Sequence, residues 1–251
     1  MNYIVGDIGN TLTKVSSFNE KFKITKSFSI ETDKINKLKY QKILIDKVFS
    51  KSTNKKILFS SVVPKAYKSI KLYLRRKKYN IYEIKDLKIE KIIRLNIKKK
   101  NELGSDRIAN AIASYDKYKT NCLIIDFGTA TTFDIVNRPG VYEGGVIAPG
   151  VNLSINNLNK STALLPAFIL KDNKKLYGKN TKEALNAGFL WGYQGLINNL
   201  IKKITSSSKI KYKIILTGGY AGFFKKFIDK NSTIDTNITI NGIIKVYKKL
   251  L

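Results

Sequence analysis

The sequence contains no histidine, and among its 251 residues it has one cysteine, one methionine, one tryptophan and four prolines. The lack of histidine excludes His-based acid–base chemistry, Ser-His triads and His-ligated zinc, so carboxylates are the expected general bases. The single cysteine, Cys122, lies in an apolar run. It cannot build a disulfide framework or a thiolate metal site, and we predict that it packs in the core.

Acidic residues are also scarce, with 18 Asp and Glu against 47 Lys and Arg, which gives a formal net charge of +29. Such a charge is compatible with a nucleic-acid or anionic-membrane partner, because dense Lys/Arg surfaces attract polyphosphate. The lysines are dispersed along the whole chain, however, and the clusters 75–78 and 98–100 are typical of solvated helix ends or loops. This distribution favours a general compositional bias and disfavours a nucleic-acid partner.

Long apolar runs are missing, since no stretch approaches the roughly 18 to 20 apolar residues that cross a bilayer. Residues 1–7 lack the basic start and apolar run of a signal peptide. We therefore expect a cytoplasmic protein with no membrane partner. A chain of 251 residues also exceeds the usual size of one domain, which favours two packed lobes.

The short apolar runs alternate in the manner of an α/β protein. Residues 3–8 and 12–18 predict a β-hairpin around a polar turn, and 22–30 a third extended segment. Further strands are expected at 56–63, 80–84, 121–126, 131–136, 142–148 and 213–216, and helices at 35–48, 64–76, 103–118, 152–162 and 181–206.

One sequence pattern occurs twice, as Asp-Ile-Gly-Asn-Thr at 7–11 and as Asp-Phe-Gly-Thr-Ala-Thr at 126–131. Each copy follows an apolar strand and offers a carboxylate, a glycine that lets a phosphate approach the backbone, and hydroxyl or amide donors. A single copy could be an ordinary turn. Two copies favour two similar lobes with a nucleotide between them, an arrangement suited to shielding phosphoryl transfer from water.

Other turns could bind ligands or could serve packing alone. Glycine turns at 144–145, 149–150 and 217–219 could bring backbone amides to a nucleotide. At 104–107, Gly-Ser-Asp-Arg places a carboxylate beside a guanidinium at a helix start, where Asp106 could take a hydroxyl proton and Arg107 could hold a carboxylate. The alternative for that segment is helix capping. The Asp-Phe-Gly triplet at 126–128 also resembles a protein-kinase motif, but the His-Arg-Asp loop of those enzymes is missing.

Taken together, these motifs resemble type III pantothenate kinases in order and spacing over nearly the full chain. They are Asp7-Ile8-Gly9-Asn10-Thr11-x-x-Lys14, Leu103-Gly104-Ser105-Asp106-Arg107, Asp126-Phe127-Gly128-Thr129-Ala130, Gly144-Gly145-x-Ile147-x-Pro149-Gly150, Gly178-x-Asn180-Thr181 and Thr217-Gly218-Gly219. The resemblance implies an α/β fold of the actin-like ATPase superfamily, with two tandem ribonuclease-H-like domains at 1–118 and 119–251 and a nucleotide cleft between them. It also implies a homodimer that transfers the ATP γ-phosphoryl group to the hydroxyl of pantothenate, in coenzyme A synthesis.

The same resemblance implies a role for individual residues. Asp106 is the expected general base, and Gly104, Ser105 and Arg107 are expected to line the pantothenate site, with Thr181 reaching it from the partner subunit. ATP is expected to contact Asp7, Ile8, Gly9, Asn10, Thr11, Leu12, Thr13, Lys14 and Thr129. Asp7 is expected to hold Mg²⁺, and Asp126 a monovalent cation, K⁺ or NH₄⁺.

One segment departs from the family pattern, because Ile97 and Lys100 stand near positions where the family usually carries a tyrosine and a proline. This departure keeps a kinase for another small hydroxylated substrate as an alternative. Two non-enzymatic alternatives are an accessory regulatory relative, resembling the Bvg accessory factor proteins, and a basic nucleic-acid-binding protein. The intact carboxylates Asp7, Asp106 and Asp126 favour catalysis.

Overall fold

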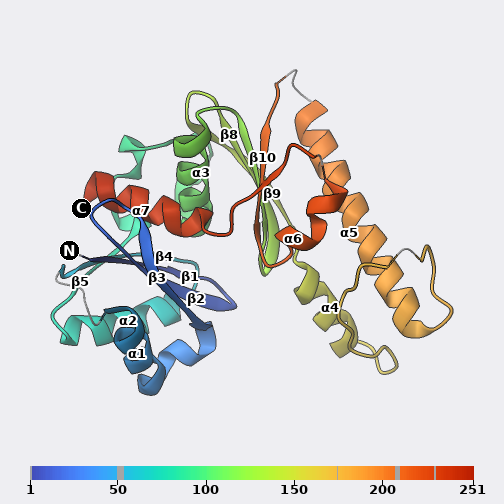
Figure 1. Ribbon diagram of the computed structural model, residues 1–251, viewed down its shortest axis with the longest axis horizontal. Coiled ribbons are helices and arrows are strands. Elements are labelled where there is room, and N and C mark those ends of the chain that lie inside the picture. Colours follow the sequence, from blue (N-terminus) through green and yellow to red (C-terminus); the bar gives the residue numbers. More distant parts are fainter. Residues whose placement is uncertain (1, 50–53, 174, 207–209, 229) are drawn as a thin grey trace. The chain divides into compact units, whose positions relative to one another are not determined.

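The computed structural model describes residues 2–49, 54–173, 175–206, 210–228 and 230–251 (Figure 1). The chain forms two compact units. Unit 1 consists of residues 1–119, 136–144 and 237–251, and unit 2 of residues 120–135 and 145–236. The domain boundary expected between residues 118 and 119 stays a prediction.

Unit 1 is built on a five-stranded sheet in the order β3-β2-β1-β4-β5. Its strands are β1 (Tyr3–Ile8), β2 (Leu12–Phe18), β3 (Ile24–Glu31), β4 (Lys56–Ser61) and β5 (Asn80–Glu83). The predicted hairpin is confirmed, since β1 pairs antiparallel with β2, and β2 with β3. Strands β1, β4 and β5 are parallel to one another, so their carboxyl ends share one edge of the sheet.

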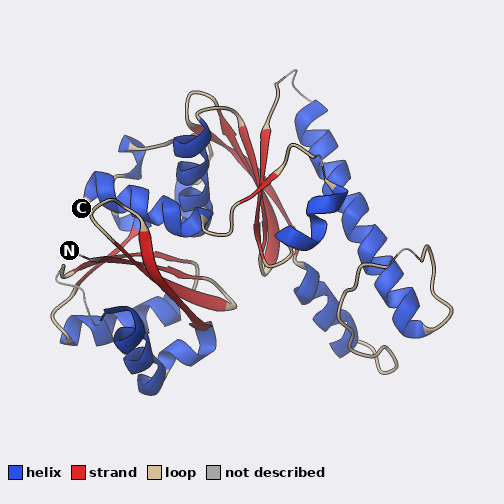
Figure 2. Ribbon diagram, viewed as in Figure 1, coloured by secondary structure: helices blue, strands red, loops and turns tan. Residues whose placement is uncertain are grey.

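Helices cover both faces of this sheet (Figure 2). On one face lie α1 (Leu38–Leu44) and α2 (Pro64–Arg76), whose apolar residues join a buried cluster that includes Ile4, Phe59 and Ile70. On the other face lie α3 (Ser105–Tyr118) and α7 (Ile238–Leu250). These two helices pack so closely that a Cβ on Gly242 would collide with the backbone of Ala109.

Short helical turns fill the connections in the described part of unit 1. They are η1 (Thr32–Asn36), η2 (Ile45–Phe49), η3 (Ile84–Asp86), η4 (Ile89–Lys91) and η5 (Lys100–Glu102), and a short strand, β6 (Arg94–Leu95), pairs in parallel with residues 141–142. The helical spacing at 35–48 therefore forms η1, α1 and a π-type turn rather than one regular helix.

Unit 2 contains most of the second sheet, whose order is β11-β10-β7-β8-β9-β6. Besides β6, the strands of this sheet are β7 (Cys122–Phe127), β8 (Ala130–Asn137), β9 (Val141–Pro149), β10 (Lys213–Gly218) and β11 (Thr233–Ile234), of which residues 136–137 of β8 and 141–144 of β9 belong to unit 1. The helical segments of unit 2 are α4 (Val151–Lys160), α5 (Thr181–Ser206), α6 (Ala221–Phe224) and η6 (Lys225–Phe227). The core between sheet and helices includes Leu123, Phe133, Leu190 and Phe224.

Cys122 is buried, as predicted, and desolvation raises the pKa of its thiol to about 12, which keeps it protonated and unreactive. Within the described ranges, no helix has the length and hydrophobicity needed to cross a membrane.

Candidate active site

The carboxyl edge of the unit 1 sheet gathers polar side chains at the ends of parallel strands. In the parallel register Asp7 of β1 lies opposite Ser60 of β4, and Phe59 lies opposite Glu83 of β5. Ser60 Oγ donates a hydrogen bond of 2.8 Å to Asp7 Oδ1. The strand register and this hydrogen bond hold the Asp7 carboxylate at the edge of the sheet.

The turn after β1 is closed by backbone bonds and leaves its outer side chains in solvent. Gly9 N donates to Leu12 O at 3.0 Å, and Thr32 Oγ1 donates to Gly9 O at 2.7 Å. Asn10 and Thr11 are exposed. An ordered turn with a glycine and exposed polar side chains beside a carboxylate can bind a phosphate–metal group.

Lys14 adds a cation to this edge. It lies opposite Asp7 in the β1–β2 register, and its Nζ donates to Asn237 Oδ1 at 2.7 Å. Burial lowers the pKa of Lys14, and the negative charge of Asp7 partly opposes that shift. Asn237 immediately precedes α7, so a residue late in the chain helps to orient a lysine of the second strand.

Asp106 lies in the first turn of α3, where its carboxylate folds back over Gly104. Asp106 Oδ1 accepts a hydrogen bond of 2.8 Å from the backbone N–H of Arg107, and a Cβ on Gly104 would collide with that oxygen. Desolvation raises the pKa of Asp106, while the hydrogen bond and the charge of Arg107 oppose the shift. A raised pKa makes this carboxylate a stronger proton acceptor than an exposed aspartate.

Ser105 differs from its neighbours because its side chain points into the protein. It is fully buried, and its hydroxyl donates to Glu83 Oε1. A direct contact between a substrate and Ser105 would therefore use the main chain. Asp106 and Arg107, which follow it, both keep part of their surface exposed.

The carboxyl edge of unit 2 is built differently, from glycine turns in close contact. Asp126 of β7 lies opposite Thr217 of the parallel strand β10, and Gly219 N donates to Phe127 O at 3.0 Å. Gly218 has a φ of +84°, and a Cβ there would lie 2.6 Å from Asp126 Oδ1. The sequence uses glycine because other residues strain this left-handed conformation and would crowd the carboxylate.

A second contact joins the Pro149-Gly150 turn to the Thr129 turn. A Cβ on Gly150 would lie within 2.6 Å of the Thr129 carbonyl carbon and 2.7 Å of Gly128 O. The hydroxyl of Tyr193 lies within hydrogen-bond distance of Gly150 O, at 3.1 Å, and of Ser154 Oγ, at 2.6 Å, so α5 contacts and holds this turn. Thr129 is exposed at the centre of the arrangement.

Multi-residue metal centres are not found in the described part of the chain, where no three His, Cys, Asp or Glu side chains come together in a way that could hold an ion. Single carboxylates remain, and they fit hard cations. Asp7 suits Mg²⁺, which commonly takes one or two protein carboxylates together with substrate phosphates. Asp126 Oδ1 and the carbonyl oxygen of Phe127 both lie close to Gly218, and carboxylate and carbonyl oxygens are donors that suit a monovalent cation.

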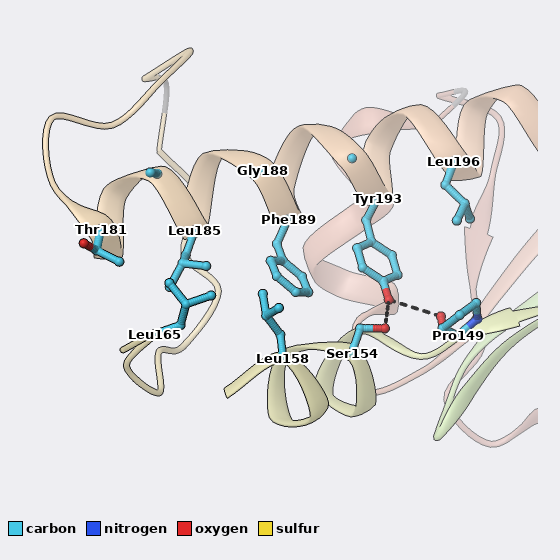
Figure 3. A pocket seen from close by; sticks show the side chains of 12 residues that line it. Pro149, Ser154, Leu158, Leu165, Thr181, Leu185, Gly188, Phe189, Tyr193 and Leu196 are labelled. Atoms are coloured by element: carbon cyan, nitrogen blue, oxygen red, sulfur yellow. Dashed lines mark hydrogen bonds between the residues drawn. The ribbon is translucent and has the colours of Figure 1, made fainter. Parts of the chain in front are cut away.

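Thr181 stands apart from the other predicted site residues of unit 2. It is exposed at the start of α5, at one end of an apolar groove between α4 and α5 whose other end reaches Pro149 and Leu196 (Figure 3). The groove has a volume of about 550 Å³. Leu196 lies fifteen positions after Thr181 on the same helix, which corresponds to a rise of about 22 Å. Unit 2 therefore does not bring Thr181 to the Asp126 turn.

The segment that departs from the family pattern leads into α3. Ile97 is partly buried just after β6, and Lys100 is exposed at the start of η5. Nearby, Asn96 Nδ2 donates to Glu143 Oε2 at 2.6 Å. No aromatic side chain stands at position 97 or 100.

Sequence reasoning did not identify three residues, Ser60, Glu83 and Asn237, which hydrogen-bond to predicted site residues. Ser60 is the penultimate residue of β4 and Glu83 is the last residue of β5. Both strands were predicted, so a polar residue near the end of an apolar strand was an available signal. Asn237 gave no such signal, because it contacts Lys14 across 223 positions of sequence. The helix α7 that follows Asn237 was not predicted either, although Ile240, Ile243 and Tyr247 form a buried stripe on it.

Comparison with known proteins identifies the family. Residues 3–203 match the family model for type III pantothenate kinase. A type III pantothenate kinase of Pelagibacter ubique is 42% identical over 243 residues, which are 96% of this chain and 97% of that protein.

Two solved structures resemble the whole chain. A conserved putative Baf family transcriptional activator from Campylobacter jejuni has a TM-score of 0.63 at 20% identity and covers 98% of both chains. A putative sugar kinase from Cytophaga hutchinsonii has a TM-score of 0.53 at 12% identity, over 99% of this chain and all of that one. At these identities the likeness concerns the fold alone, and together with the two sheets and their helices it confirms the predicted α/β class. On the strength of the family model and of the relative that matches it almost end to end, the chain belongs to the type III pantothenate kinase family.

Proposed function

We propose that this protein transfers the γ-phosphoryl group of ATP to the primary hydroxyl of pantothenate, in coenzyme A synthesis. One observation carries the proposal. Unit 1 contains both Asp106, a carboxylate of raised pKa that stands beside the guanidinium of Arg107 at the start of α3, and the turn after β1 that begins with the Asp7 carboxylate. Family membership supports the same reaction. The accessory and nucleic-acid-binding alternatives have no comparable observation in their favour.

Asp106 acts as the general base. Its carboxylate takes the proton from the hydroxyl as that oxygen bonds to phosphorus, and burial favours this step because it disfavours the charged, unprotonated form of Asp106. The guanidinium of Arg107 holds the pantothenate carboxylate and sets the direction of the hydroxyl. Gly104 leaves room for Asp106 to fold back, and the Ser105 main chain completes the substrate wall.

The phosphates of ATP contact the turn of unit 1 from Asp7 through Ile8, Gly9, Asn10, Thr11, Leu12 and Thr13 to Lys14, and the Thr129 turn of unit 2. Lys14 neutralises phosphate charge. Asp7 would hold Mg²⁺ and Asp126 a monovalent cation, K⁺ or NH₄⁺, and when bound these ions supply positive charge against the phosphoryl oxygens. The assignment to a nucleotide cleft and to the domains 1–118 and 119–251 is part of the proposal.

A homodimer accounts for the isolated position of Thr181. Large apolar side chains are exposed around the start of α5, with Leu164 91%, Leu176 77% and Tyr177 74% accessible to solvent. Together with the apolar groove they form a surface that a second copy of the chain can bury. In such a dimer Thr181 contacts the pantothenate bound by the partner subunit. We place the enzyme in the cytoplasm.

A second candidate is a kinase for another small hydroxylated acid. The observation that favours it is the replacement of the family's tyrosine and proline by Ile97 and Lys100 in the segment before α3. Phosphate-binding turns and the general base are the same in both candidates, so only the acceptor differs.

The test measures ADP release with ATP, Mg²⁺ and K⁺, with pantothenate, with a panel of small hydroxy acids, and without acceptor. We expect turnover that depends on pantothenate, and a fall in kcat of about a thousandfold in Asp106→Asn, since general-base catalysis contributes about 10² to 10⁴. Asp33→Asn, an exposed aspartate of η1, is the matched control and should behave as wild type. Turnover with a different acid selects the second candidate, and full activity of Asp106→Asn rejects the assignment of the base.

The dimer is tested by mixing two inactive variants. Asp106→Asn and Thr181→Arg each spoil every site in their own homodimer, but a heterodimer keeps one site with both native residues if Thr181 serves the partner's site. Co-expression should then restore about a quarter of wild-type activity. Sedimentation at several concentrations gives the oligomeric state, and a purely additive, inactive mixture rejects the shared site.

A further inference from the structure

Glu83 is a buried carboxylate that lies behind the proposed catalytic base. It ends β5 and is only 8% exposed. Its Oε1 accepts the hydroxyl of Ser105, its Oε2 accepts the backbone N–H of Lys85 at 2.6 Å, and the backbone of Ser61 also hydrogen-bonds to it. One side chain thus joins the end of β4, the start of η3 and the first turn of α3.

Because Glu83 is buried, the stability of this edge of the sheet depends on its hydrogen bonds. Removing a carboxylate from water is costly unless its oxygens are paired, so an unsupported Glu83 would destabilise this edge of the sheet. Burial raises the pKa of Glu83, as does the negative charge of Asp86, while the bonds from Ser105, Lys85 and Ser61 oppose the rise. The carboxylate is therefore held in place by the segments that it connects.

The start of α3 depends on this connection more than most helix starts do. Its N-cap residue is Gly104, which has no side chain to cap the helix and restrains the backbone weakly. The first helical residue, Ser105, is instead tied to Glu83, and the second is Asp106. A shift of Ser105 moves the backbone of Asp106 directly, because the two are adjacent in one turn.

We propose that Glu83 is a positioning residue for phosphoryl transfer, which acts through Ser105 to hold the first turn of α3 so that Asp106 faces the hydroxyl that it deprotonates. This inference rests on the proposed function, in which Asp106 is the general base. Glu83 itself touches neither substrate nor the reacting atoms in this role. It sets where the base stands and how much water reaches it.

The expected consequences follow from the hydrogen bonds. Gln at position 83 keeps one acceptor oxygen for the backbone N–H of Lys85 but presents a neutral NH₂ group to Ser105, so the charge-assisted bond donated by the Ser105 hydroxyl is replaced by a weaker neutral bond in which that hydroxyl must turn and accept. A loosened turn displaces Asp106, and misplacement of a catalytic group by about 1 Å can cost about a hundredfold in rate. Water that enters also reduces the desolvation of Asp106, whose other charged neighbours are Arg107 and Lys85.

The experiment compares Glu83→Gln, Ser105→Ala, their double variant, and Glu102→Gln as a control, an exposed glutamate three residues before Ser105 that pairs with Lys99. We expect Glu83→Gln and Ser105→Ala to lower kcat about tenfold to a hundredfold with KM for ATP unchanged, and the double variant to fall little further, because both break one connection. Ser105→Thr, which keeps the hydroxyl, should recover part of the rate. The acid limb of the kcat profile should move to lower pH as Asp106 becomes better hydrated.

The controls separate the possible failures. Circular dichroism melts show whether each variant is folded at the assay temperature, and if Glu83→Gln is not, Ser105→Ala and Ser105→Thr carry the test. Wild-type kcat and pH profile in folded Glu83 and Ser105 variants, with Asp106→Asn inactive, overturn the role of Glu83 alone. Full activity of Asp106→Asn overturns the proposed base instead, whatever the Glu83 variants do.

Discussion

The carboxyl edges of the two sheets carry the same sequence pattern but are built from different materials. In unit 1 side chains meet side chains or backbone amides, as in Ser60 to Asp7, Lys14 to Asn237 and Asp106 to Arg107 N. In unit 2 backbone meets backbone, with Gly150 against the Thr129 turn and Gly218 against Phe127. Side chains can exchange protons and carry full charge, whereas packed turns offer shape and fixed dipoles. The two copies of the motif therefore support different chemistry, side-chain chemistry in unit 1 and backbone contacts in unit 2.

Because the two edges are built differently, substitutions at them should affect different properties of the protein. Carboxylates whose pKa is raised by burial, Asp106 and Glu83, both lie in unit 1, a common feature of sites that perform proton transfer. In unit 2 the constrained feature is instead the backbone conformation of glycines, such as the left-handed φ of Gly218. We expect changes at the unit 1 edge to reduce turnover with the fold retained, and changes at the unit 2 edge to reduce stability.

The largest expected effect is that of Gly150→Ala in unit 2. A new Cβ would meet the carbonyl group of Thr129 and the oxygen of Gly128, which are backbone atoms and cannot rotate away. We expect a loss of about 3 kcal/mol or more in the free energy of unfolding, since overpacking against backbone forces the chain to shift. Urea unfolding followed by circular dichroism measures it.

Gly222→Ala is the matched control in the same unit, because a Cβ at that position meets nothing within 4 Å and lies in the short helix α6. It should change stability by less than about 1 kcal/mol, in the stabilising direction. Equal losses in the two variants would mean that the tight backbone contact of Gly150 is not what limits unit 2.

A smaller effect of another kind is expected for Gly104→Ala in unit 1. Here the new Cβ meets the end of the Asp106 side chain, which can rotate aside at little cost to the fold. We expect a change of less than about 1 kcal/mol in stability, and a fall in kcat of about tenfold to a hundredfold because the displaced base is out of place. A stability loss as large as that of Gly150→Ala, with kcat unchanged, would remove the distinction between the two edges.

Much of the fold could be predicted because its signals are local. The periodic apolar runs and the single Pro64 placed α2 at 64–76, as the structure has it, and α5 at 181–206. The Asp and Gly residues at or just after the ends of the predicted strands indicated where the carboxyl edges of both sheets lie. The predicted helix at 35–48 is broken in the structure, since local spacing does not report where the chain must turn to pack against β2 and β3.

What could not be predicted depends on contacts between distant segments. The parallel register that sets Ser60 beside Asp7 arises from packing of β4 against β1, and the return of α7 to unit 1 brings Asn237 to Lys14. The direction of Ser105 was also hidden, because a serine at a helix start is as compatible with an exposed cap as with the buried bond to Glu83. Sequence reasoning therefore located the motifs but not the residues that hold them.

The smallest expected effect compares one ATP contact from each edge. Lys14→Met removes a cation held beside Asp7, and charge-assisted bonds contribute about 1.5 to 3 kcal/mol. We expect KM for ATP to rise at least about tenfold. Thr129→Ala removes an exposed neutral hydroxyl from a turn whose backbone remains, so KM should rise only about threefold. Steady-state kinetics at saturating pantothenate measure both.

Lys26→Met, a change to an exposed lysine of β3, is the control for loss of charge alone and should leave KM for ATP within about twofold, because exposed charges far from the phosphates are screened by salt. The order of the other two variants is informative. If Thr129→Ala raises KM for ATP more than Lys14→Met does, the side chains of unit 2 contribute more to ATP binding than its backbone does. The proposed difference between the two edges is then wrong. If Lys14→Met dominates at low salt and the difference narrows as salt is added, the contribution of unit 1 is electrostatic, as its side-chain construction requires.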